Sequence, residues 1–434
     1  MKNVFGFIGL LVFSSCSLNQ KIAKVAKREI VNDSVLIPAH VGIAVYDTEA
    51  GKYLYQYQGN KYFVPASNTK LFSLYAGIKY LGDSIPGLKY YETADTLYIQ
   101  PTGDPSLLHP DFTSQRVADF LKSKNKPIVI NEMNWKEEPW GYGWAWDDYN
   151  DDYMAERSPL PVYGNTIRWL QAVDKQTKQV TIRSTPFLKW QQNKPTEAAG
   201  NKFLVKRKRD ENYFQITTGT ENAAQEVPFV TNGIETAKLF LSDSLKLNLS
   251  SSLSAFNHPL FTIHSIPADS LYKLMMYRSD NFFAEQTLLM AANEKLGIMN
   301  DEAMIAYLKK NDLKDIPQQP KWVDGSGLSR YNLFTPQSFV WLLNKMKNEF
   351  GLARMEALLP TGGLGTLSNL YAEEKGFIFA KTGTLSNNTS LSGYLITKKN
   401  KLLIFSLQAG NFQGSAAPVR LAYERFIKYL RSNY

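Results

Sequence analysis

The sequence contains a single cysteine and only four histidines in 434 residues. One cysteine cannot form an intramolecular disulfide, so a fold held together by disulfides is excluded. Metal sites usually need histidine, cysteine or carboxylate ligands at short, regular spacings. The histidines show no such spacing, so neither a metal nor another cofactor is implied; they are His40, His109, His258 and His264.

Beyond the N-terminus, the chain has no apolar run long enough to cross a bilayer. The first 16 residues, MKNVFGFIGLLVFSSC, place a lysine, an apolar run and small residues before Cys16, as in a secretory signal. The stretch resembles a bacterial lipoprotein signal, although Phe13 departs from the aliphatic residue preferred there. We expect export to the periplasm or cell envelope, with Cys16 lipidated and providing the one attachment to the membrane. A plain cleaved signal peptide is the alternative.

Zinc-finger, RNP and helix-turn-helix patterns are also missing, so the net charge of +9 does not by itself indicate a nucleic-acid partner. The densest basic run, KFLVKRKRDENY, continues directly into Asp210 and Glu211, and we interpret it as a solvated strand end or loop. A hydrophobic content of 44% and a charged content of 21% are typical of a globular protein. The length suits two or three lobes.

The two ends of the chain differ from its middle in the secondary structure that their sequence predicts. Residues 17–33 resemble a tether with a short amphipathic helix, and residues 34–100 predict a hairpin followed by a helix that begins near Ser67. Residues 101–255 contain short β-like runs between turns, which indicates an inserted β-rich region of one or two small domains. Residues 256–434 predict helices, three successive strands and a closing helix. We therefore expect an α+β fold, in which both chain ends build one antiparallel sheet with helices packed on it.

The inserted region contains an aromatic-rich stretch, WKEEPWGYGWAWDDYNDDY, at residues 135–153. Tryptophans in such numbers can form a face that binds a glycan or a protein partner. They can equally pack an irregular loop from within. The sequence leaves both interpretations open.

The pattern Ser-x-x-Lys is common, and this chain has it at Ser67/Lys70, Ser123/Lys126 and Ser270/Lys273. The first pair lies where a strand gives way to a helix. Residues three apart share a helix face, so Lys70 can take the proton of the Ser67 hydroxyl and make it a nucleophile. Unpaired N–H groups at the helix start can stabilise an oxyanion. Alternatively, Ser67 is an ordinary helix cap and Lys70 a surface residue.

A second motif, YRSDNFF, lies between two helical runs and contains Ser279, Asp280 and Asn281. The Ser279 hydroxyl can relay a proton to a leaving group, and the Asn281 amide can hold both a lysine and a substrate amide. The alternative is an ordinary turn between helices, because Ser, Asp and Asn favour turns.

A third motif, FAKTGTLSNN, follows an alternating run, so Lys381 is expected near the end of a strand. Lys381 can bind a terminal carboxylate together with the hydroxyls of Thr382 and Thr384. Gly383 leaves room for a substrate backbone beside the strand. The N–H groups of Thr384 and Ser67 can form an oxyanion hole. The alternative is an edge-strand lysine beside a turn.

In this order, the three motifs resemble the signature of penicillin-binding proteins and serine β-lactamases. Between Lys70 and Ser279 the numbering advances by 209, and such a long insertion resembles the D-alanyl-D-alanine carboxypeptidase/endopeptidase family of the penicillin-binding protein 4 type, also called class C low-molecular-mass penicillin-binding proteins. The resemblance covers about residues 35 to 434. It includes the stretches TGDPSL, DGSGLSRYNLFTP, LPTGGLGTL and AKTGTLSNNTSLSGYL.

The resemblance implies a penicillin-recognising serine transpeptidase/β-lactamase-like domain, an antiparallel sheet with helices on both faces, interrupted by the β-rich insertion. It implies hydrolysis of D-Ala-D-Ala ends, of D-Ala-containing cross-links of peptidoglycan, or of both, through an acyl-enzyme on Ser67. Peptidoglycan stem peptides are the implied partners, β-lactams the implied covalent inhibitors, and no nucleic acid is implied. The implied catalytic residues are Ser67, Lys70, Ser279 and Asn281. Lys381, Thr382, Gly383 and Thr384 are implied to bind substrate, with Asp280, Asp324, Gly325, Ser326 and Gly327 in supporting roles.

Three alternatives stay open. A β-lactamase or an esterase can use the same scaffold, although we find no Glu-x-x-Leu-Asn segment of the kind that directs a deacylating water in class A β-lactamases. A non-catalytic lipoprotein that binds the cell wall is the third. The sequence does not separate carboxypeptidase from endopeptidase action, and it gives neither the type of cross-link nor the oligomeric state.

Overall fold

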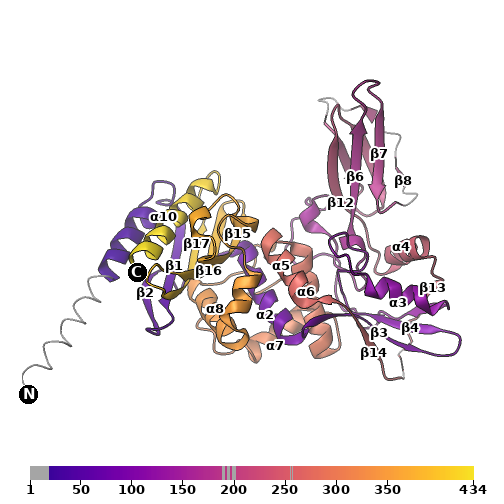
Figure 1. The fold of residues 1–434 in the computed structure, drawn as a ribbon, viewed down its shortest axis with the longest axis horizontal. Helices are drawn as coiled ribbons and strands as arrows, with labels where there is room; N and C mark the ends of the chain where they lie inside the picture. Colours follow the sequence, from indigo (N-terminus) through magenta and orange to yellow (C-terminus); the bar gives the residue numbers. More distant parts are fainter. Residues whose placement is uncertain (1–18, 188–190, 193–195, 198–201, 255, 257) are drawn as a thin grey trace, which may run out of the picture. The chain divides into compact units, whose positions relative to one another are not determined.

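The computed structural model describes residues 19–187, 191–192, 196–197, 202–254, 256 and 258–434 (Figure 1). The predicted signal and Cys16 lie outside the described residues. Within the described ranges, no helix is both long enough and apolar enough to pass through a membrane. The chain forms two compact units. The first consists of Met1–Tyr75, Lys273–Ser279 and Ile305–Tyr434, and the second of Ala76–Tyr272 and Asp280–Met304.

The first unit is built on a five-stranded antiparallel sheet in the order β15-β16-β17-β1-β2. The N-terminal part of the chain supplies a hairpin, and the C-terminal part supplies a three-stranded meander. The β1–β17 pairing, from His40↔Gly410 to Asp47↔Leu403, joins the two chain ends. The strands are β1 (His40–Asp47), β2 (Lys52–Tyr57), β15 (Ile378–Leu385), β16 (Asn388–Ile396) and β17 (Leu402–Gly410).

Helices cover both faces of this sheet. Alternate residues of β1, Val41, Ile43 and Val45, pack in one core with the apolar stripe of α10 (Ala417–Asn433) and with the N-terminal helical residues 19–31, which end in η1 (Lys27–Val31). On the other face, the Tyr394 hydroxyl of β16 donates to a carbonyl of α8 (Pro336–Phe350). These contacts confirm the predicted sheet with helices on both faces, and Figure 1 shows α10 and α8 beside it.

The first unit also contains the start of α2 (Lys70–Tyr80), preceded by the short 3₁₀ turn η2 (Ala66–Thr69). Phe72 in α2 packs against Trp322, Phe334 and Phe339, with ring centroids 4.7–5.6 Å apart. This aromatic cluster fixes the beginning of the helix. The remaining elements of this unit are the end of α5 (Ala268–Arg278), most of α7 (Asp301–Lys310), α9 (Leu352–Leu358), η5 (Gly365–Leu367) and η6 (Ala372–Glu374).

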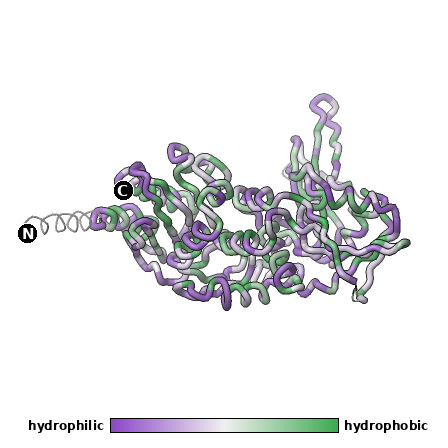
Figure 2. The backbone as a smooth tube through the Cα atoms, turned by 60° about the horizontal axis from the view of Figure 1, so that its bottom comes forward, coloured by the Kyte–Doolittle hydropathy of each residue, from purple (hydrophilic) through white to green (hydrophobic). Residues whose placement is uncertain are grey.

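The second unit contains three sheets. A mixed five-stranded sheet has the order β13-β5-β4-β3-β14, made of β3 (Ser84–Glu92), β4 (Leu97–Pro101), β5 (Ile128–Ile130), β13 (Leu249–Ser251) and β14 (Phe261–Pro267). An antiparallel sheet has the order β12-β6-β7, made of β6 (Thr166–Val173), β7 (Val180–Thr185) and β12 (Ala223–Pro228). A small sheet joins β8 (Gln191–Gln192), β9 (Thr196–Glu197), β10 (Leu204–Arg207) and β11 (Tyr213–Thr218). The exposed tip between β6 and β7, residues 174–179, is strongly hydrophilic (Figure 2).

One apolar core runs through these sheets. It joins Ile99 of β4, Trp169 of β6 and Phe214 of β11 with the buried face of α4, which includes Phe240. Among the described residues, the helices of this unit are the end of α2, α3 (Arg116–Lys124), α4 (Glu235–Leu245), the start of α5, α6 (Asn281–Leu296) and the first residues of α7, with the 3₁₀ turns η3 (Asp152–Met154) and η4 (Tyr163–Asn165).

The predicted hairpin, the helix after Ser67, the three C-terminal strands and the closing helix are all confirmed, and so is the β-rich middle of the chain. The two compact units do not divide the chain at the boundaries that we expected after residues 100 and 255. The reason is that β3 and β14, which lie on either side of that segment, pair with each other. The predicted domain limits, 34–100, 101–255 and 256–434, remain a prediction.

Candidate active site

Ser67 lies in η2, three residues before the first residue of α2. The turn before the helix is tight, because Ala66 has a φ of 49°, in the left-handed region that non-glycine residues seldom adopt. Ser67 is partly exposed, whereas Ala66 and Asn68 on either side are buried. The backbone therefore presents one hydroxyl to solvent at the start of a helix that is otherwise packed into the unit.

Lys70 brings its terminal amine to this hydroxyl. Its Nζ donates to Ser67 Oγ at 2.9 Å and to the Ser326 carbonyl at 2.7 Å, and the side chain is fully buried. The other two Ser-x-x-Lys pairs lack this arrangement: the Ser123 hydroxyl donates to its own helix, and Ser270 and Lys273 are both exposed. Of the three pairs, the first is therefore the one with a base in contact with its serine.

The loop 324–329 holds Lys70 in place. The buried Asp324 carboxylate accepts from the N–H groups of Gly327 (2.8 Å) and Ser329 (2.7 Å). This folds the loop so that the Ser326 carbonyl reaches Lys70 and the Gly325 carbonyl reaches the Ser73 hydroxyl of α2. Gly327 has a φ of +86°, and a Cβ there would collide with the Ala66 carbonyl. Four of the five residues with predicted supporting roles, Asp324, Gly325, Ser326 and Gly327, thus belong to a loop that contacts the Ser67 turn and the start of α2.

Ser279 and Lys381 form a second hydroxyl–amine pair in the same unit. Ser279 follows α5 in the left-handed conformation, with a φ of 61°. Lys381 is fully buried on β15, and its Nζ donates to Ser279 Oγ at 2.9 Å and to the Thr382 carbonyl at 2.6 Å. The second and third motifs, separated by about a hundred residues of sequence, therefore meet through this contact.

Asp280 and Asn281 belong to the second unit, at the start of α6. Asp280 caps that helix by accepting from the Phe283 N–H at 2.9 Å. The Asn281 side-chain amide donates to the Tyr153 carbonyl at 2.9 Å. The turn interpretation of this motif thus holds for Asp280, while the predicted contact of Asn281 with lysine and substrate stays a prediction.

The strand β15 forms one edge of the five-stranded sheet. Its Ala380 N–H donates to the Pro360 carbonyl at 2.9 Å, on the side away from β16. Backbone groups of residues two apart face the same edge, so the N–H groups of Thr382 and Thr384 also face away from β16. This orientation is the one that an oxyanion donor at Thr384 requires.

Gly383 allows β15 to approach the nucleophile segment. A Cβ at this position would lie 2.5 Å from the Pro65 carbonyl and 3.0 Å from the Ser67 N atom. We predicted that this glycine makes room for a substrate backbone. The structure shows that it also makes room for η2, and this places the Ser67 N–H beside the residue that precedes Thr384.

The two active-site lysines influence each other. Complete burial lowers the pKa of Lys381 well below its ordinary value, and the nearby charge of Lys70 lowers it further. The pair therefore loses its first proton at a lower pH than an exposed lysine does. A neutral amine next to a serine hydroxyl is what general-base catalysis needs.

Replacing Lys381 by methionine is expected to stabilise the fold at neutral pH while impairing catalysis. Because the pKa of Lys381 is depressed on folding, the unfolded chain binds more protons, and the free energy of unfolding rises with pH by at most about 1.4 kcal/mol per unit. Lys381→Met should remove that slope. Urea unfolding at several pH values between about 6 and 9 tests this; identical slopes for both proteins would contradict it.

Four residues of this region escaped the sequence analysis. The Asn68 amide donates to the Lys381 carbonyl at 2.9 Å, the Ser390 hydroxyl donates to the Pro65 carbonyl at 2.6 Å, and Ser73 reaches the loop 324–329. The fourth, Arg420 of α10, donates from Nη2 to Thr384 Oγ1 at 2.6 Å. The first two could have been considered because they lie within or beside the motifs. Ser73 and Arg420 carry no pattern of their own.

Comparison with known proteins places this geometry in a family. The model of the D-Ala-D-Ala carboxypeptidase 3 (S13) family matches residues 20–423. A D-alanyl-D-alanine carboxypeptidase of Actinomadura sp. (strain R39) is 25% identical over 89% of this chain and 80% of its own length. The D-alanyl-D-alanine carboxypeptidase DacB of Haemophilus influenzae is 22% identical over 85% of this chain and 84% of its own length.

Solved structures show the same fold. Penicillin-binding protein 4 of Haemophilus influenzae superposes with a TM-score of 0.75 at 20% identity, over 95% of this chain and 99% of the other. A predatory endopeptidase of Bdellovibrio bacteriovorus, in complex with an immunity protein, gives a TM-score of 0.53 at 14% identity, over 90% of this chain and 92% of the other. The resemblance seen in the three motifs is thereby confirmed over nearly the whole chain, and the protein belongs to the D-Ala-D-Ala carboxypeptidase 3 (S13) family.

Proposed function

We propose that this protein is a serine peptidase that cleaves after D-alanine in peptidoglycan stem peptides, with Ser67 as the acylated nucleophile. The observation that carries the proposal is the contact between Lys70 Nζ and Ser67 Oγ, next to Gly383 on the edge strand that also bears Lys381. Family membership and the curated relatives, which are carboxypeptidases by name, support it.

In this proposal, the Ser67 hydroxyl attacks the carbonyl carbon of the penultimate D-Ala while neutral Lys70 takes its proton. The N–H groups of Ser67 and Thr384 stabilise the resulting oxyanion. The carbon–nitrogen bond then breaks, and the departing amine receives a proton through the Ser279 hydroxyl, which is hydrogen-bonded to Lys381. Asn281 positions the substrate. Water next cleaves the ester to Ser67, which releases the peptide and restores the hydroxyl.

The terminal carboxylate of the substrate needs a positive partner. Lys381 and the hydroxyls of Thr382 and Thr384 are the predicted binding groups, but the amine of Lys381 is fully buried and donates to Ser279 Oγ and to the Thr382 carbonyl. An arginine guanidinium is a cation that can pair with a carboxylate, and that of Arg420 touches the Thr384 hydroxyl. We therefore assign the charge recognition of the carboxylate to Arg420, with the hydroxyls fixing its orientation.

Arg420→Ala is expected to raise KM for a peptide ending in D-Ala-D-Ala by roughly 10- to 100-fold with little change in kcat, since a charge-assisted hydrogen bond is lost. Arg330→Ala is the matched control, because Arg330 donates to the nearby Ser386 carbonyl and is exposed. A C-terminally amidated peptide should bind equally to Arg420→Ala and to the unchanged protein. An equal KM for the free acid in both would contradict the assignment.

The proposal is tested with two substrates. A pentapeptide ending in D-Ala-D-Ala should release free D-alanine, and purified sacculi should release monomeric muropeptides if cross-links are also cleaved. The ratio of the two rates separates carboxypeptidase from endopeptidase action. Release of neither product under conditions where a control peptidase is active would overturn the proposal.

We further propose that the protein is exported and held at the membrane by lipid on Cys16. The support is the signal-like sequence before this cysteine. Cys16→Ser should move the protein from the detergent-soluble membrane fraction to the aqueous fraction and abolish its labelling by radioactive palmitate. Unchanged fractionation together with unchanged labelling would contradict the anchor.

A further inference from the structure

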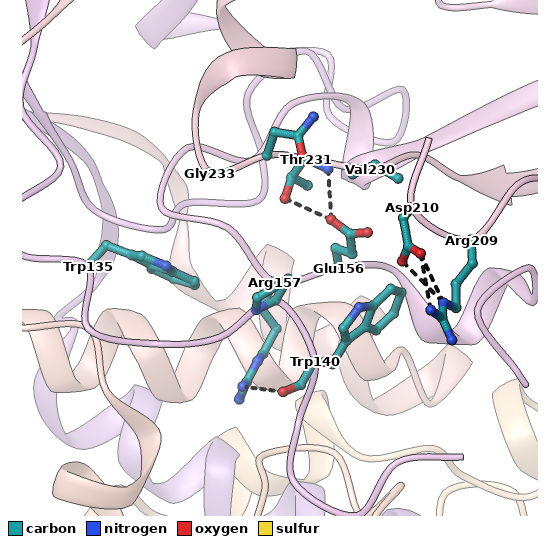
Figure 3. A pocket seen from close by; sticks show the side chains of 11 residues that line it. Trp135, Trp140, Glu156, Arg157, Arg209, Asp210, Val230, Thr231 and Gly233 are labelled. Carbon is teal, nitrogen blue, oxygen red and sulfur yellow. Dashed lines mark hydrogen bonds and ion pairs between the residues drawn. The ribbon is translucent and has the colours of Figure 1, made fainter. Parts of the chain in front are cut away.

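The second unit contains a pocket of about 220 Å³ that the proposed chemistry does not use. Segments 135–157 and 209–233 line it, so it includes the first part of the aromatic-rich stretch. Figure 3 shows the side chains around it. Its volume is below the roughly 300–1,000 Å³ of sites for drug-sized ligands and suits a single ring.

Two tryptophans give the pocket its apolar walls. Trp135 and Trp140 are each half-buried, and Figure 3 shows their indoles on different sides of the pocket. The Trp140 ring meets Trp144 edge to face, with centroids 6.4 Å apart, and the Trp144 ring packs against the Arg157 guanidinium at 5.6 Å. These contacts fix the indole of Trp140, so it offers a rigid apolar face at low entropic cost.

A carboxylate lies opposite these walls. Glu156 is only 3% exposed, and its Oε2 accepts from the Thr231 N–H at 2.7 Å and from the Thr231 hydroxyl at 2.9 Å (Figure 3). Oε1 lies 4.0 Å from Arg207 Nη2. The carboxylate therefore has a fixed orientation, and burial raises the pKa of Glu156. Such a group accepts hydrogen bonds from a ligand without having to reorganise.

The charges around the pocket are balanced. The Arg157 guanidinium lies 2.6 Å from Asp301 and 3.0 Å from Glu137, and in Figure 3 it points toward the Trp140 carbonyl. Arg209 pairs with Asp210 at 3.2 Å. Since each of these cations has an anionic partner, neither an anion nor a cation gains a free counter-charge here, and a neutral polar ligand fits best.

We propose that this pocket binds one pyranose ring of an N-acetylhexosamine glycan strand. The C–H face of the sugar packs on the indoles, and its hydroxyl groups donate to Glu156. The exposed side chain of Asn232, at the rim, is available for the acetamido group. The identity of the strand as that of peptidoglycan rests on the proposed function, whereas the sugar binding itself does not. Such a site would hold the enzyme on its polymer between cleavage events.

The test is titration of the full-length protein with chitotetraose, a soluble oligomer of β-1,4-linked N-acetylglucosamine, followed by calorimetry and tryptophan fluorescence. We expect a dissociation constant on the order of 1 mM, weakened roughly tenfold by Trp135→Ala and by Trp140→Ala. Trp146→Ala is the matched control, because Trp146 belongs to the same stretch, is 72% exposed and does not line the pocket.

The same variants separate this site from the active site. Trp135→Ala should leave D-alanine release from the soluble pentapeptide unchanged and lower the release of products from sacculi. The inference is overturned if the unchanged protein does not bind chitotetraose, or if Trp146→Ala weakens binding as much as Trp135→Ala does. Failure of D-alanine release in all proteins, with sugar binding intact, would count against the proposed function and not against the pocket.

Discussion

Replacing Ser67 by alanine is expected to abolish release of D-alanine from a D-Ala-D-Ala pentapeptide, with a loss of at least about 10⁴-fold in kcat/KM. The reason is that Ser67 Oγ is the nucleophile of the proposal and the hydroxyl with which Lys70 Nζ is in contact at 2.9 Å. Alanine removes the attacking atom but keeps the backbone N–H that stabilises the oxyanion. The free energy of unfolding, measured by thermal denaturation, should therefore change by less than about 1 kcal/mol.

The chain supplies its own controls for this experiment. Ser123→Ala and Ser270→Ala change serines with the same Ser-x-x-Lys spacing, yet both serines are exposed and neither has the buried lysine that Ser67 has. Both variants should retain full activity. Activity that survives in Ser67→Ala, or that disappears in either control, would show that the pairing of Ser67 with Lys70 is not the catalytic one.

The second large effect is expected for Gly383→Ala. The new Cβ would lie 2.5 Å from the Pro65 carbonyl and 3.0 Å from the Ser67 N atom, and both are backbone atoms that cannot move aside as a side chain can. The edge strand must then retreat from η2, which widens the distance between the N–H groups of Ser67 and Thr384. Losing one oxyanion donor costs about 100- to 1,000-fold in kcat, and we expect a loss of that size.

Gly410→Ala is the matched control for this second prediction. Gly410 lies on β17 of the same sheet, and a Cβ there meets only the side-chain oxygen of Asn388, at 2.9 Å. The activity of this variant should fall by less than about threefold, because a side chain can adjust. Stopped-flow acylation by a chromogenic cephalosporin measures both variants. Equal effects at the two glycines would mean that the close approach of β15 to η2 is not needed for catalysis.

The antiparallel sheet could be predicted from the sequence alone. The hairpin at one chain end and the meander at the other show the alternation of apolar and polar residues that is typical of β-strands. The sequence was also sufficient to identify the three motifs. Their order along the chain favours Ser67 as the nucleophile over Ser123 and Ser270, which share only the Ser-x-x-Lys spacing. The sequence could not predict which groups hold Lys70. The carbonyl of Ser326 reaches Lys70 only because the Asp324 carboxylate folds a loop that lies more than 250 residues away along the chain.

The roles proposed for Arg420 and for the sugar pocket could not be predicted from the sequence, for a different reason. A single arginine in an amphipathic helix has the appearance of any solvated residue, and its contact with Thr384 depends on how α10 lies against the sheet. The pocket combines tryptophans of the segment 135–157 with residues of the distant segment 209–233. The composition therefore indicated an aromatic stretch but no binding site. In both cases the decisive fact is tertiary proximity, which leaves no local pattern.

The most direct test of the central claim is to locate the covalent adduct. The protein is incubated with benzylpenicillin, denatured rapidly, digested and analysed by mass spectrometry. The account predicts one added penicilloyl group on the peptide that contains Ser67, and none in the Ser67→Ala variant. An adduct on another peptide, or no adduct under conditions that label a control penicillin-binding protein, would contradict it.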